Sequence, residues 1–457
     1  MRYDLIVLGG GPAGYLAAER AGQAGMKTLC IEKRRLGGTC LNEGCIPTKT
    51  LLYSAKLYDG VRHGGAYGVT VQGAQVDHAA VLARKDKVVE RLVRGVSASL
   101  KASKVQVVAE EGTVLPRNSP EFRVQVAGEI YEASRLLIAS GSHPVIPALP
   151  GIQEGLGQGF ILTNREILQM KHVPRRLAVV GGGVIGLELA SYFNSIGSRV
   201  TVIEMMPQIA GNSDPELSSA LQKMYEKQGV QFLLESRVTG FVPGAVRCEK
   251  DGTPLEVPAD QVLLSIGRRP NVEGLGLERI GVRTQKGAVV TDEHMQTNIA
   301  NVYAAGDVNG RFMLAHVAYR EAEVAVNHML GRRDQMRYRA VPSVVYTNPE
   351  MASVGETEQS AREKGMDVQV VKLPMEYAGR YVAENEEGGG LCKMVVSRDT
   401  HAIVGAQLLC NYASEFIVAL AAFIELELPL EDIREIMFPH PAVCEIIREA
   451  AFQCHIS

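Results

Sequence analysis

Hydrophobic and small residues follow one another in a regular order at the start of the chain. A short apolar run at residues 3–8 leads directly into glycines, a stretch of small residues follows, and a second apolar run ends at Glu32. Residues 177–204 repeat this order. Because a strand, a glycine turn, a helix of small residues and a second strand form a βαβ unit, the chain is predicted to contain two such units in an α/β fold.

Two other patterns complete the outline of the chain. Residues 81–103 place apolar side chains at helical spacing among charged ones, which predicts an amphipathic helix with a solvated face. From Val341 onward, short strands such as residues 389–397 alternate with helical segments, which predicts a separate α+β domain. No stretch reaches about 18 uninterrupted apolar residues, so no transmembrane helix is predicted.

Glycines occupy matched positions in the two βαβ units. In a dinucleotide-binding turn the first glycine permits the tight bend, the second lets the backbone approach a pyrophosphate, and the third lets helix and strand pack closely. An acidic residue at the end of the second strand accepts hydrogen bonds from ribose hydroxyls. The chain therefore predicts two dinucleotide sites. The matched residues are Gly9, Gly11, Gly14 and Glu32 in the first unit and Gly181, Gly183, Gly186 and Glu204 in the second, each pair 172 positions apart.

The second site is predicted to prefer NAD over NADP. Residues 205–211, which follow Glu204, read MMPQIAG and contain no Arg or Lys to meet a 2′-phosphate.

Composition narrows the class of protein. The 457 residues suffice for about three domains of roughly 150 residues each. With 48 basic and 51 acidic residues, the formal charge of −3 offers no electrostatic basis for binding nucleic acid or an anionic membrane. A hydrophobic fraction of 46% excludes global disorder. Without a signal peptide at the N-terminus, the chain is predicted to be a soluble protein of the cytoplasm.

Cys40 and Cys45 are candidates for redox chemistry. Five residues of regular helix turn about 500°, so the two side chains would diverge by about 140°. A disulfide between them requires an irregular turn, which Gly44 and Pro47 favour. In a reducing compartment a catalytic disulfide or free thiols are more common than a structural bridge. At this point, two unrelated buried thiols remain an alternative.

Residues 37–49 (GGTCLNEGCIPTK) resemble the redox-active segment of the pyridine nucleotide–disulfide oxidoreductases. The resemblance extends along the whole chain in the family's order. Its other motifs are residues 136–142 (LLIASGS), 263–271 (LLSIGRRPN), 297–307 (TNIANVYAAGD) and 439–445 (PHPAVCE).

The resemblance implies a fold of two Rossmann-like dinucleotide-binding domains plus a C-terminal α+β dimerisation domain. The implied boundaries are residues 1–146 for the first segment of the FAD domain, 147–267 for the NAD domain, 268–338 for the segment that completes the FAD domain, and 339–457 for the dimerisation domain.

FAD and NAD are the cofactors that the resemblance implies. The residues that it assigns to FAD are Gly9, Gly11, Gly14, Glu32, Gly38, Thr39, Lys49, Gly112, Ser140, Gly141, Ser142, Asp307, Met313, Leu314, Ala315 and His316. The residues that it assigns to NAD are Gly181, Gly183, Val184, Gly186, Glu188, Glu204, Val238 and Gly267. No metal site is expected, because the remaining cysteines lack metal-ligand spacing.

Roles in catalysis also follow from the resemblance. Cys45 is the thiol nearest the flavin, and Cys40 exchanges with the substrate. His440 is the base that removes thiol protons, and Glu445 orients its ring. Lys49 and Glu188 form an ion pair beside the flavin and nicotinamide rings. The plain alternatives are a structural histidine and two solvated charges.

Within this family the chain is most similar to members that oxidise dihydrolipoamide with NAD⁺. The signs are Leu41, Ile46 and Thr48 around the thiols, and residues 313–316 (MLAH). The resemblance implies an obligate homodimer that serves the lipoyl-bearing domain of an acyltransferase or H-protein, in a 2-oxoacid dehydrogenase, acetoin or glycine-cleavage system. Alternatives are another disulfide reductase, an NADH oxidase, or a flavoprotein subunit without turnover. Cys444 departs from the family, which commonly has Ser there.

Overall fold

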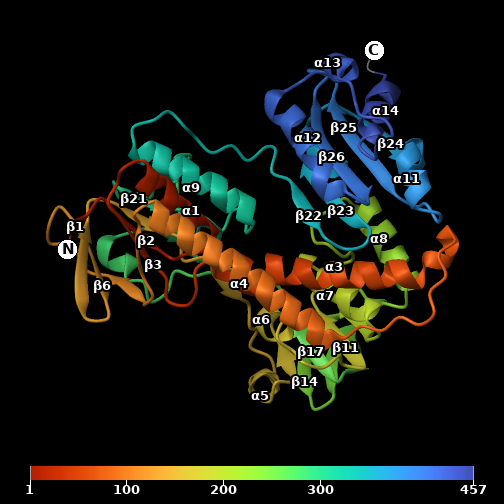
Figure 1. Ribbon diagram of the computed structural model, residues 1–457, viewed down its shortest axis with the longest axis horizontal. Helices are drawn as coiled ribbons and strands as arrows, with labels where there is room; N and C mark the ends of the chain where they lie inside the picture. Colours follow the sequence, from red (N-terminus) through yellow and green to blue (C-terminus); the bar gives the residue numbers. More distant parts are fainter. Residues whose placement is uncertain (1, 456–457) are drawn as a thin grey trace. The chain divides into compact units, whose positions relative to one another are not determined.

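The computed structural model describes residues 2–455, and the chain divides into two compact units (Figure 1). The first unit comprises Met1–Thr50, Ala79–Ile146 and Gly267–Arg337. The second comprises Leu51–His78, Pro147–Ile266 and Tyr338–Ser457. Each unit is built from segments that lie far apart in the sequence.

A five-stranded parallel sheet forms the centre of the first unit. All four residues of its middle strand, β2, are buried, which is typical of a parallel sheet covered on both faces. Helix α1 (Pro12–Gln23) buries a face of alanines and one glycine, and Figure 1 shows it side by side with α9 (Ala315–Met329). The strand order is β21 (Val302–Ala304), β8 (Leu136–Ile138), β2 (Leu5–Leu8), β3 (Thr28–Ile31) and β4 (Gln106–Val108).

Smaller elements surround this sheet. An antiparallel meander packs its valines and Phe122 against one face of the parallel sheet. The elements are β1 (Arg2–Tyr3), α2 (Gly38–Glu43), α4 (His78–Ala102), β5 (Gly112–Val114), β6 (Phe122–Val126), β7 (Glu129–Ala133), β9 (Ser142–Pro144), β18 (Arg268–Pro270), η2 (Leu277–Ile280), β19 (Thr284–Gln285), β20 (Ala288–Val289) and η3 (Asp307–Asn309). Helix α3 (Cys45–Arg62) begins in the first unit and continues into the second.

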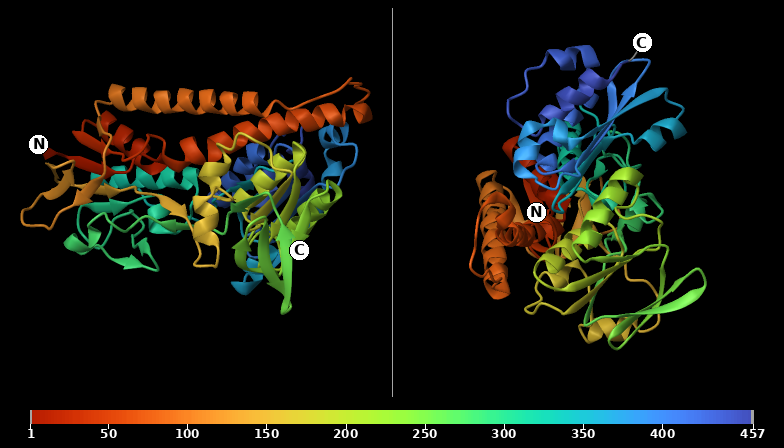
Figure 2. Two further views of the ribbon diagram at one scale, coloured as in Figure 1. Left: turned by 90° about the horizontal axis from the view of Figure 1, so that it is seen from below. Right: turned by 90° about the vertical axis from the view of Figure 1, so that its right-hand side faces the viewer.

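The second unit contains a parallel sheet with the same arrangement. Its order is β10 (Ile161–Leu162), β17 (Gln261–Leu264), β11 (Arg176–Val180), β12 (Arg199–Ile203) and β13 (Gln231–Leu233), so that β11 takes the place of β2. Helix α7 (Val184–Ser195) follows β11 as α1 follows β2. An antiparallel sheet of β14 (Arg237–Val242), β15 (Ala245–Lys250) and β16 (Thr253–Pro258) packs on it (green in Figure 2). The two predicted Rossmann-like domains are therefore confirmed.

The second unit also holds an antiparallel sheet near the C-terminus. Helix α12 (Ala413–Leu426) buries residues spaced by four, three and four positions, which form one face, and packs on β23 and β26. The strand order is β22 (Ser343–Val345), β23 (Glu350–Gly355), β26 (Ile403–Cys410), β25 (Leu391–Ser397) and β24 (Val368–Pro374). The remaining elements of the unit are η1 (Gly64–Tyr67), α5 (Ile152–Gly157), α6 (Asn164–Ile167), α8 (Pro215–Lys227), α10 (Glu358–Glu363), η4 (Met375–Tyr377), α11 (Gly379–Glu384), α13 (Leu430–Glu435) and α14 (Glu445–Gln453). This confirms the expected α+β domain.

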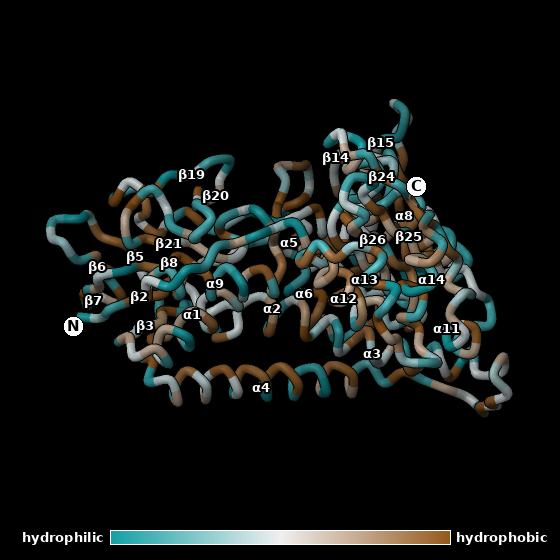
Figure 3. The backbone as a smooth tube through the Cα atoms, turned by 90° about the horizontal axis from the view of Figure 1, so that it is seen from above, coloured by the Kyte–Doolittle hydropathy of each residue, from teal (hydrophilic) through white to brown (hydrophobic). Residues whose placement is uncertain are grey.

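Helix α4 confirms the amphipathic segment predicted at residues 81–103. Hydrophobic and hydrophilic residues alternate along its length (Figure 3), and Lys85, Val89 and Leu100 are its buried positions. None of the helices within residues 2–455 is both long enough and apolar enough to cross a bilayer.

A buried lysine joins the C-terminal sheet to the NAD-type domain within the second unit. The Lys393 side chain on β25 is 3% exposed, and its Nζ lies 2.8 Å from Asp214, 3.0 Å from Glu358 and 3.2 Å from Glu216. Asp214 is 1% exposed and caps α8. Burial acts to lower the pKa of Lys393, but the hydrogen bonds to Asp214 and Glu358 outweigh it and raise that pKa, so the lysine stays charged.

We expect Lys393→Met to destabilise the protein strongly. The substitution keeps the length of the side chain but leaves Asp214 charged and buried without its partner, which typically costs about 3–5 kcal/mol. Lys372→Met is the matched control, because Lys372 also pairs with Glu216 but is 46% exposed, where an ion pair contributes less than about 1 kcal/mol. Thermal unfolding followed by circular dichroism measures both variants. Equal melting temperatures for the two would contradict the assignment.

Candidate active site

The first glycine turn leaves no room for side chains at Gly9 and Gly14. Gly9 has φ +111°, and a Cβ there would lie 2.2 Å from the carbonyl oxygen of Ala139. A Cβ on Gly14 would lie 1.8 Å from the carbonyl oxygen of Gly9. Helix α1 begins at Pro12, so its free N–H groups and positive dipole end lie at this bare turn. The turn therefore fits the pyrophosphate of a dinucleotide.

The second turn repeats this geometry. Gly181 has φ +104°, and its Cβ would lie 2.5 Å from the carbonyl oxygen of Ser265. A Cβ on Gly186 would lie 2.1 Å from the carbonyl oxygen of Gly181. Gly11 and Gly183 are the N-caps of α1 and α7, and both have extended backbone. The second turn therefore fits a dinucleotide for the same reasons.

Each predicted ribose-binding carboxylate also clamps its own turn, a role that sequence reasoning missed. Glu32 accepts hydrogen bonds from the N–H groups of Gly10 and Arg34, both at 2.7 Å. Glu204 accepts from Gly182 at 2.7 Å and Met206 at 2.8 Å, which are the positions 172 residues later. Since a carboxylate has about four acceptor positions, each keeps capacity for ribose hydroxyls.

A polar network at the exit of β8 brings together predicted FAD residues from two segments. Ser142 donates to Asp307 at 2.5 Å, and Ser140 donates to the carbonyl oxygen of Asn271 at 2.6 Å. Arg268 donates to the Ser142 hydroxyl at 2.8 Å. Sequence reasoning missed Arg268 and Asn271 as parts of this network, although both lie in the 263–271 motif. The network holds the Asp307 carboxylate at the end of β8, in the same parallel sheet that carries the first glycine turn.

The other predicted FAD residues lie at turns and helix starts of the first unit. Gly38 has φ +58°, and its Cβ would lie 2.6 Å from Cα of Gly11, so α2 begins against the first turn. Gly112 lies on β5, where a Cβ would crowd Ile31 and Val124 at 3.2 Å. Thr39 lies on α2, Gly141 follows β8 with φ +70°, and Met313, Leu314, Ala315 and His316 form the start of α9 with Leu314 as N-cap.

Most of the predicted NAD residues lie in the second unit. Val184 is the first residue of α7, and Val238 lies on β14. Glu188 is 3% exposed, and its Oε1 accepts a hydrogen bond from the Tyr346 N–H at 3.0 Å. Gly267 and Lys49 belong to the first unit, so the part of Gly267 in the NAD site and the pairing of Lys49 with Glu188 stay predictions.

The Cys40 and Cys45 thiols meet across a break between two helices. Cys40 lies on α2 and Cys45 begins α3, and Gly44 between them has φ −146° and ψ −109°. A Cβ on Gly44 would lie 3.0 Å from the carbonyl oxygen of Thr39, so the break favours glycine. This confirms the irregular turn that the spacing predicts.

Neighbouring groups shift the pKa of Cys40 in opposite directions. The hydrogen bond between the two sulfur atoms, followed by burial and the charge of Cys45, raises the pKa of Cys40. Lys49, one helical turn after Cys45, acts in the other direction. The two thiols therefore titrate as a coupled pair. After the first proton leaves, the thiol that keeps its proton donates a hydrogen bond to the thiolate.

His440 and Glu445 form a hydrogen-bonded pair in the second unit. Nδ1 of His440 lies 2.9 Å from Oε1 of Glu445, and Glu445 also accepts from the Ala442 N–H at 2.8 Å. Burial acts to raise the pKa of Glu445, but Ala442 and His440 outweigh it and leave that pKa lowered. The His440 side chain is 79% exposed, so its Nε2 faces outward with the ring held in place. This arrangement suits a general base.

The remaining cysteines show no sign of a second reactive site. Cys444 is half-buried, and burial raises its pKa, so its thiol is less reactive than an ordinary one. The other thiols, Cys30, Cys248, Cys392, Cys410 and Cys454, are buried. Throughout residues 2–455, no cluster of three or more His, Cys, Asp or Glu side chains could hold a metal ion.

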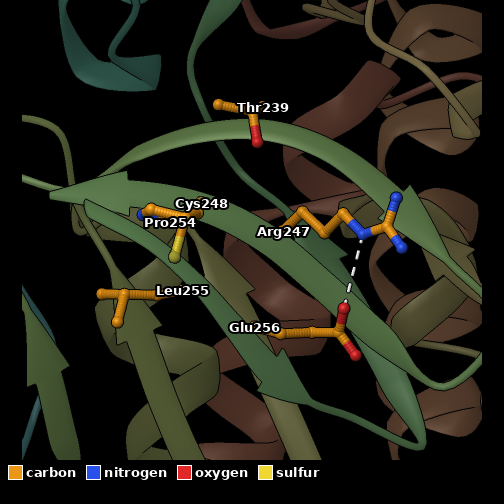
Figure 4. Close-up of a pocket in the computed structure, with 6 residues that line it drawn as sticks. All are labelled: Thr239, Arg247, Cys248, Pro254, Leu255 and Glu256. Carbon is orange, nitrogen blue, oxygen red and sulfur yellow. Dashed lines mark hydrogen bonds and ion pairs between the residues drawn. The ribbon is translucent and has the colours of Figure 1, made fainter. Parts of the chain in front are cut away.

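A shallow depression on the antiparallel sheet β14–β16 contains none of the predicted site residues. Figure 4 shows its lining, in which Arg247 and Glu256 form an exposed ion pair at 3.4 Å. The other lining residues are Thr239, Cys248, Pro254 and Leu255.

Comparison with known proteins gives consistent matches over both units. Residues 3–322 match the pyridine nucleotide-disulphide oxidoreductase family, and residues 341–451 match the dimerisation domain of the same family. The chain is 39% identical over 455 residues to the dihydrolipoyl dehydrogenase of Mycoplasma pneumoniae, covering 98% of each protein. It is 38% identical over 456 residues to the dihydrolipoyl dehydrogenase of Chlamydia muridarum, covering 98% of this chain and 96% of that protein. The crystal structure of LpdA from Mycobacterium tuberculosis superposes with a TM-score of 0.89 at 27% identity, covering 99% of both chains.

We expect Gly14→Ala to abolish FAD retention and Gly186→Ala to abolish NAD⁺ binding while FAD is kept. In each case the added methyl group collides with a backbone carbonyl of the turn, which cannot give way as a flexible side chain can. The ratio of flavin to protein absorbance and a titration with NAD⁺ measure the two losses. Gly95→Ala is the control, because a Cβ there meets nothing within 4 Å and alanine favours the helix. Full FAD content in Gly14→Ala would contradict the assignment.

Proposed function

Because the chain belongs to the pyridine nucleotide–disulphide oxidoreductases, we propose that it oxidises dihydrolipoyl groups and reduces NAD⁺ through a redox-active Cys40–Cys45 pair. The relatives described above carry the name dihydrolipoyl dehydrogenase. The observation that carries the proposal is the sulfur pair itself, which lies at the break between α2 and α3, in the same unit as the bare turn that fits FAD.

The chemistry is a dithiol–disulfide exchange coupled to hydride transfer. A substrate thiolate attacks Cys40 of the disulfide, and the S–S bond breaks to leave Cys45 as a thiolate. The second substrate thiolate then attacks the mixed disulfide, which releases Cys40 and the oxidised substrate. The substrate loses two electrons and two protons, NAD⁺ gains a hydride, and one proton is released. Bound FAD supplies the link between these halves, because a flavin accepts electron pairs from a dithiol and gives hydride to NAD⁺.

Side chains of this chain account for the binding and proton steps. The turn at residues 9–14, with Glu32 and Asp307, holds the flavin nucleotide, and Glu204 binds the ribose of NAD⁺. His440 removes the substrate thiol protons at Nε2, while Glu445 holds Nδ1 and stabilises the imidazolium. These assignments rest on the geometry of each group and on the resemblance of the motifs.

An obligate homodimer completes the proposal. The family's dimerisation domain spans residues 341–451, which includes His440 and Glu445. A ring that is held by a carboxylate yet 79% exposed is suited to completing the site of a second copy. The neighbouring Met437 is 96% exposed and offers apolar surface for that contact.

The physiological partner is proposed to be the lipoyl-bearing domain of an acyltransferase or H-protein, in the cytoplasm. A dihydrolipoyl group on a carrier protein presents the same dithiol as free dihydrolipoamide. Buried free thiols such as Cys30, Cys392 and Cys410 are typical of a reducing compartment.

The first test is NADH formation by the purified flavoprotein with dihydrolipoamide, run beside reduced glutathione. Rapid NADH formation with dihydrolipoamide alone is the expected result. If NADH bleaches the flavin but dihydrolipoamide gives no turnover, the fold stands and the substrate is rejected.

Variants then assign the residues. Cys45→Ser should abolish turnover with dihydrolipoamide while NADH still bleaches the flavin, since only electron transfer through the two cysteines is lost.

His440→Gln should slow turnover by about 10²–10⁴-fold, the usual contribution of a general base. His401→Gln is the matched control, because His401 is also exposed and lies 3.3 Å from a glutamate, Glu431. A slow His401→Gln with an unimpaired His440→Gln would refute the base assignment.

A further inference from the structure

Two tyrosines form a hydrogen-bonded pair beside the redox thiols, and the chemistry above does not use them. The hydroxyl groups of Tyr15 on α1 and Tyr319 on α9 are 2.5 Å apart. Their ring centroids are 5.9 Å apart at an interplanar angle of 62°, which is the favourable edge-to-face arrangement. Both side chains are half-buried. The pair bridges two helices that come from opposite ends of the first unit's sequence.

The backbone brings this pair close to Cys40. Gly38, at the start of α2, lies so close to Gly11 that a Cβ on it would be 2.6 Å from Cα of Gly11. Tyr15 is one helical turn beyond Gly11 and donates its N–H to the carbonyl oxygen of Gly11 at 2.9 Å. Cys40 is two residues beyond Gly38 on α2. Tyr15 and the Cys40 thiol therefore extend from two helix starts whose backbones touch, and Tyr319 on α9 is hydrogen-bonded to Tyr15.

Electrostatics support this placement. Burial, then the hydrogen bond to Tyr319, raises the pKa of Tyr15 well above its usual value, and the charge of Cys40 adds to the effect. Burial also raises the pKa of Tyr319, with further contributions from the charges of Cys40 and Cys45. Both phenols therefore stay protonated near neutral pH and can donate hydrogen bonds.

A count of hydrogens shows that the pair has a donor to spare. Two hydroxyl groups hold two protons, and a single O–H···O hydrogen bond uses one of them. The hydroxyl that accepts this bond keeps its own proton for another acceptor. Within residues 2–455 neither phenol oxygen has a second hydrogen-bond partner. Cys40 is the thiol whose charge acts on both phenols.

We propose that the Tyr15–Tyr319 pair is a positioning element that donates its spare hydrogen bond to the Cys40 sulfur when this sulfur is a thiolate. Cys40 becomes a thiolate when the mixed disulfide resolves, and a donor held in place stabilises that leaving group. The step moves no electrons and transfers no proton, because the phenol keeps its hydrogen. The inference rests on the proposed function in that Cys40 is the exchanging thiol.

The groups that act on Cys40 come from three helices. Cys45 and Lys49 face it from α3, Tyr15 from α1 and Tyr319 from α9. Lys49 supplies a positive charge, and the edge-to-face rings hold the phenol hydroxyls in a fixed geometry. Tyrosines at these two positions therefore add directional stabilisation to the charge of the lysine.

Alkylation of Cys40 tests the proposal without turnover. The holoenzyme is reduced with dithiothreitol, desalted without oxygen and treated with limiting iodoacetamide over a range of pH, and mass spectrometry of the Cys40 peptide gives the rate. Tyr319→Phe and Tyr15→Phe keep both rings and remove one hydroxyl each. Loss of a hydrogen bond to a charged group is expected to shift the Cys40 profile upward by about one pH unit, which makes alkylation about tenfold slower at neutral pH.

Tyr303→Phe is the matched control. Tyr303 is buried in the same unit. Its hydroxyl group is hydrogen-bonded to His328 at 2.9 Å and does not take part in the Tyr15–Tyr319 pair. Its profile should superpose on that of the wild type, which separates the specific effect from general loosening of the unit.

The outcomes separate this proposal from the proposed function. A shift in either pair variant with an unshifted Tyr303→Phe supports the pair, and the larger shift identifies the tyrosine that carries the spare proton. Unshifted profiles in both pair variants overturn the proposal even if the wild type oxidises dihydrolipoamide. If the Tyr319→Phe variant loses FAD, the pH profile of Cys40 alkylation in Tyr15→Phe alone decides whether the proposal stands. A wild type that does not oxidise dihydrolipoamide but shows these shifts would reject only the substrate.

Discussion

The close approach of the Gly11 and Gly38 backbones in the first unit is the constraint on which the candidate site depends. Two backbones meet there with no side chain between them, since a methyl group on Gly38 would lie 2.6 Å from Cα of Gly11. One backbone leads into α1, whose N-terminus faces the dinucleotide turn, and the other leads into α2, which carries Cys40. The separation of Cys40 from the first glycine turn is therefore set by the main chain.

The glycine turn with its glutamate occurs in both units, but the cysteine pair Cys40 and Cys45 follows the first turn. Both turns exclude Cβ atoms in the same way, and both are clamped by a glutamate that accepts two backbone N–H groups. Each clamp is a charge-assisted hydrogen bond, which is stronger than a neutral one and holds the turn ready for its nucleotide. Only the first unit continues into a helix break with two cysteines. Duplication thus supplies two nucleotide sites, and the break at Gly44 adds the redox centre.

Charge is handled differently at the thiols and in the C-terminal domain. At Lys393 a buried cation is surrounded by three carboxylates, so removing one partner leaves a charge without solvent and is costly. At Cys40 the electrostatic neighbours on the other side chains are the charge of Lys49 and two neutral phenols. A partly exposed site with few fixed charges lets the sulfur gain and lose its charge during exchange. The arrangement at Lys393 suits a group that stays charged and stabilises the fold. The arrangement at Cys40 suits a thiol whose charge changes during the reaction.

Spacing along the chain determined the features that depend on nearby residues. The glycine turns, the acidic residues 18 positions beyond them and the irregular turn at Gly44 all join residues close in sequence, where backbone geometry limits the possibilities. The family motifs added the pairing of His440 with Glu445 and the arrangement of two Rossmann-like domains and an α+β domain. Only the tertiary structure decided which distant groups meet: Tyr15 with Tyr319 across 304 positions, Lys393 with Asp214 across 179, and Ser142 with Asp307 across 165. Such contacts depend on how sheets and helices pack in three dimensions, and a linear pattern of residue types contains no distance between segments that the fold brings together.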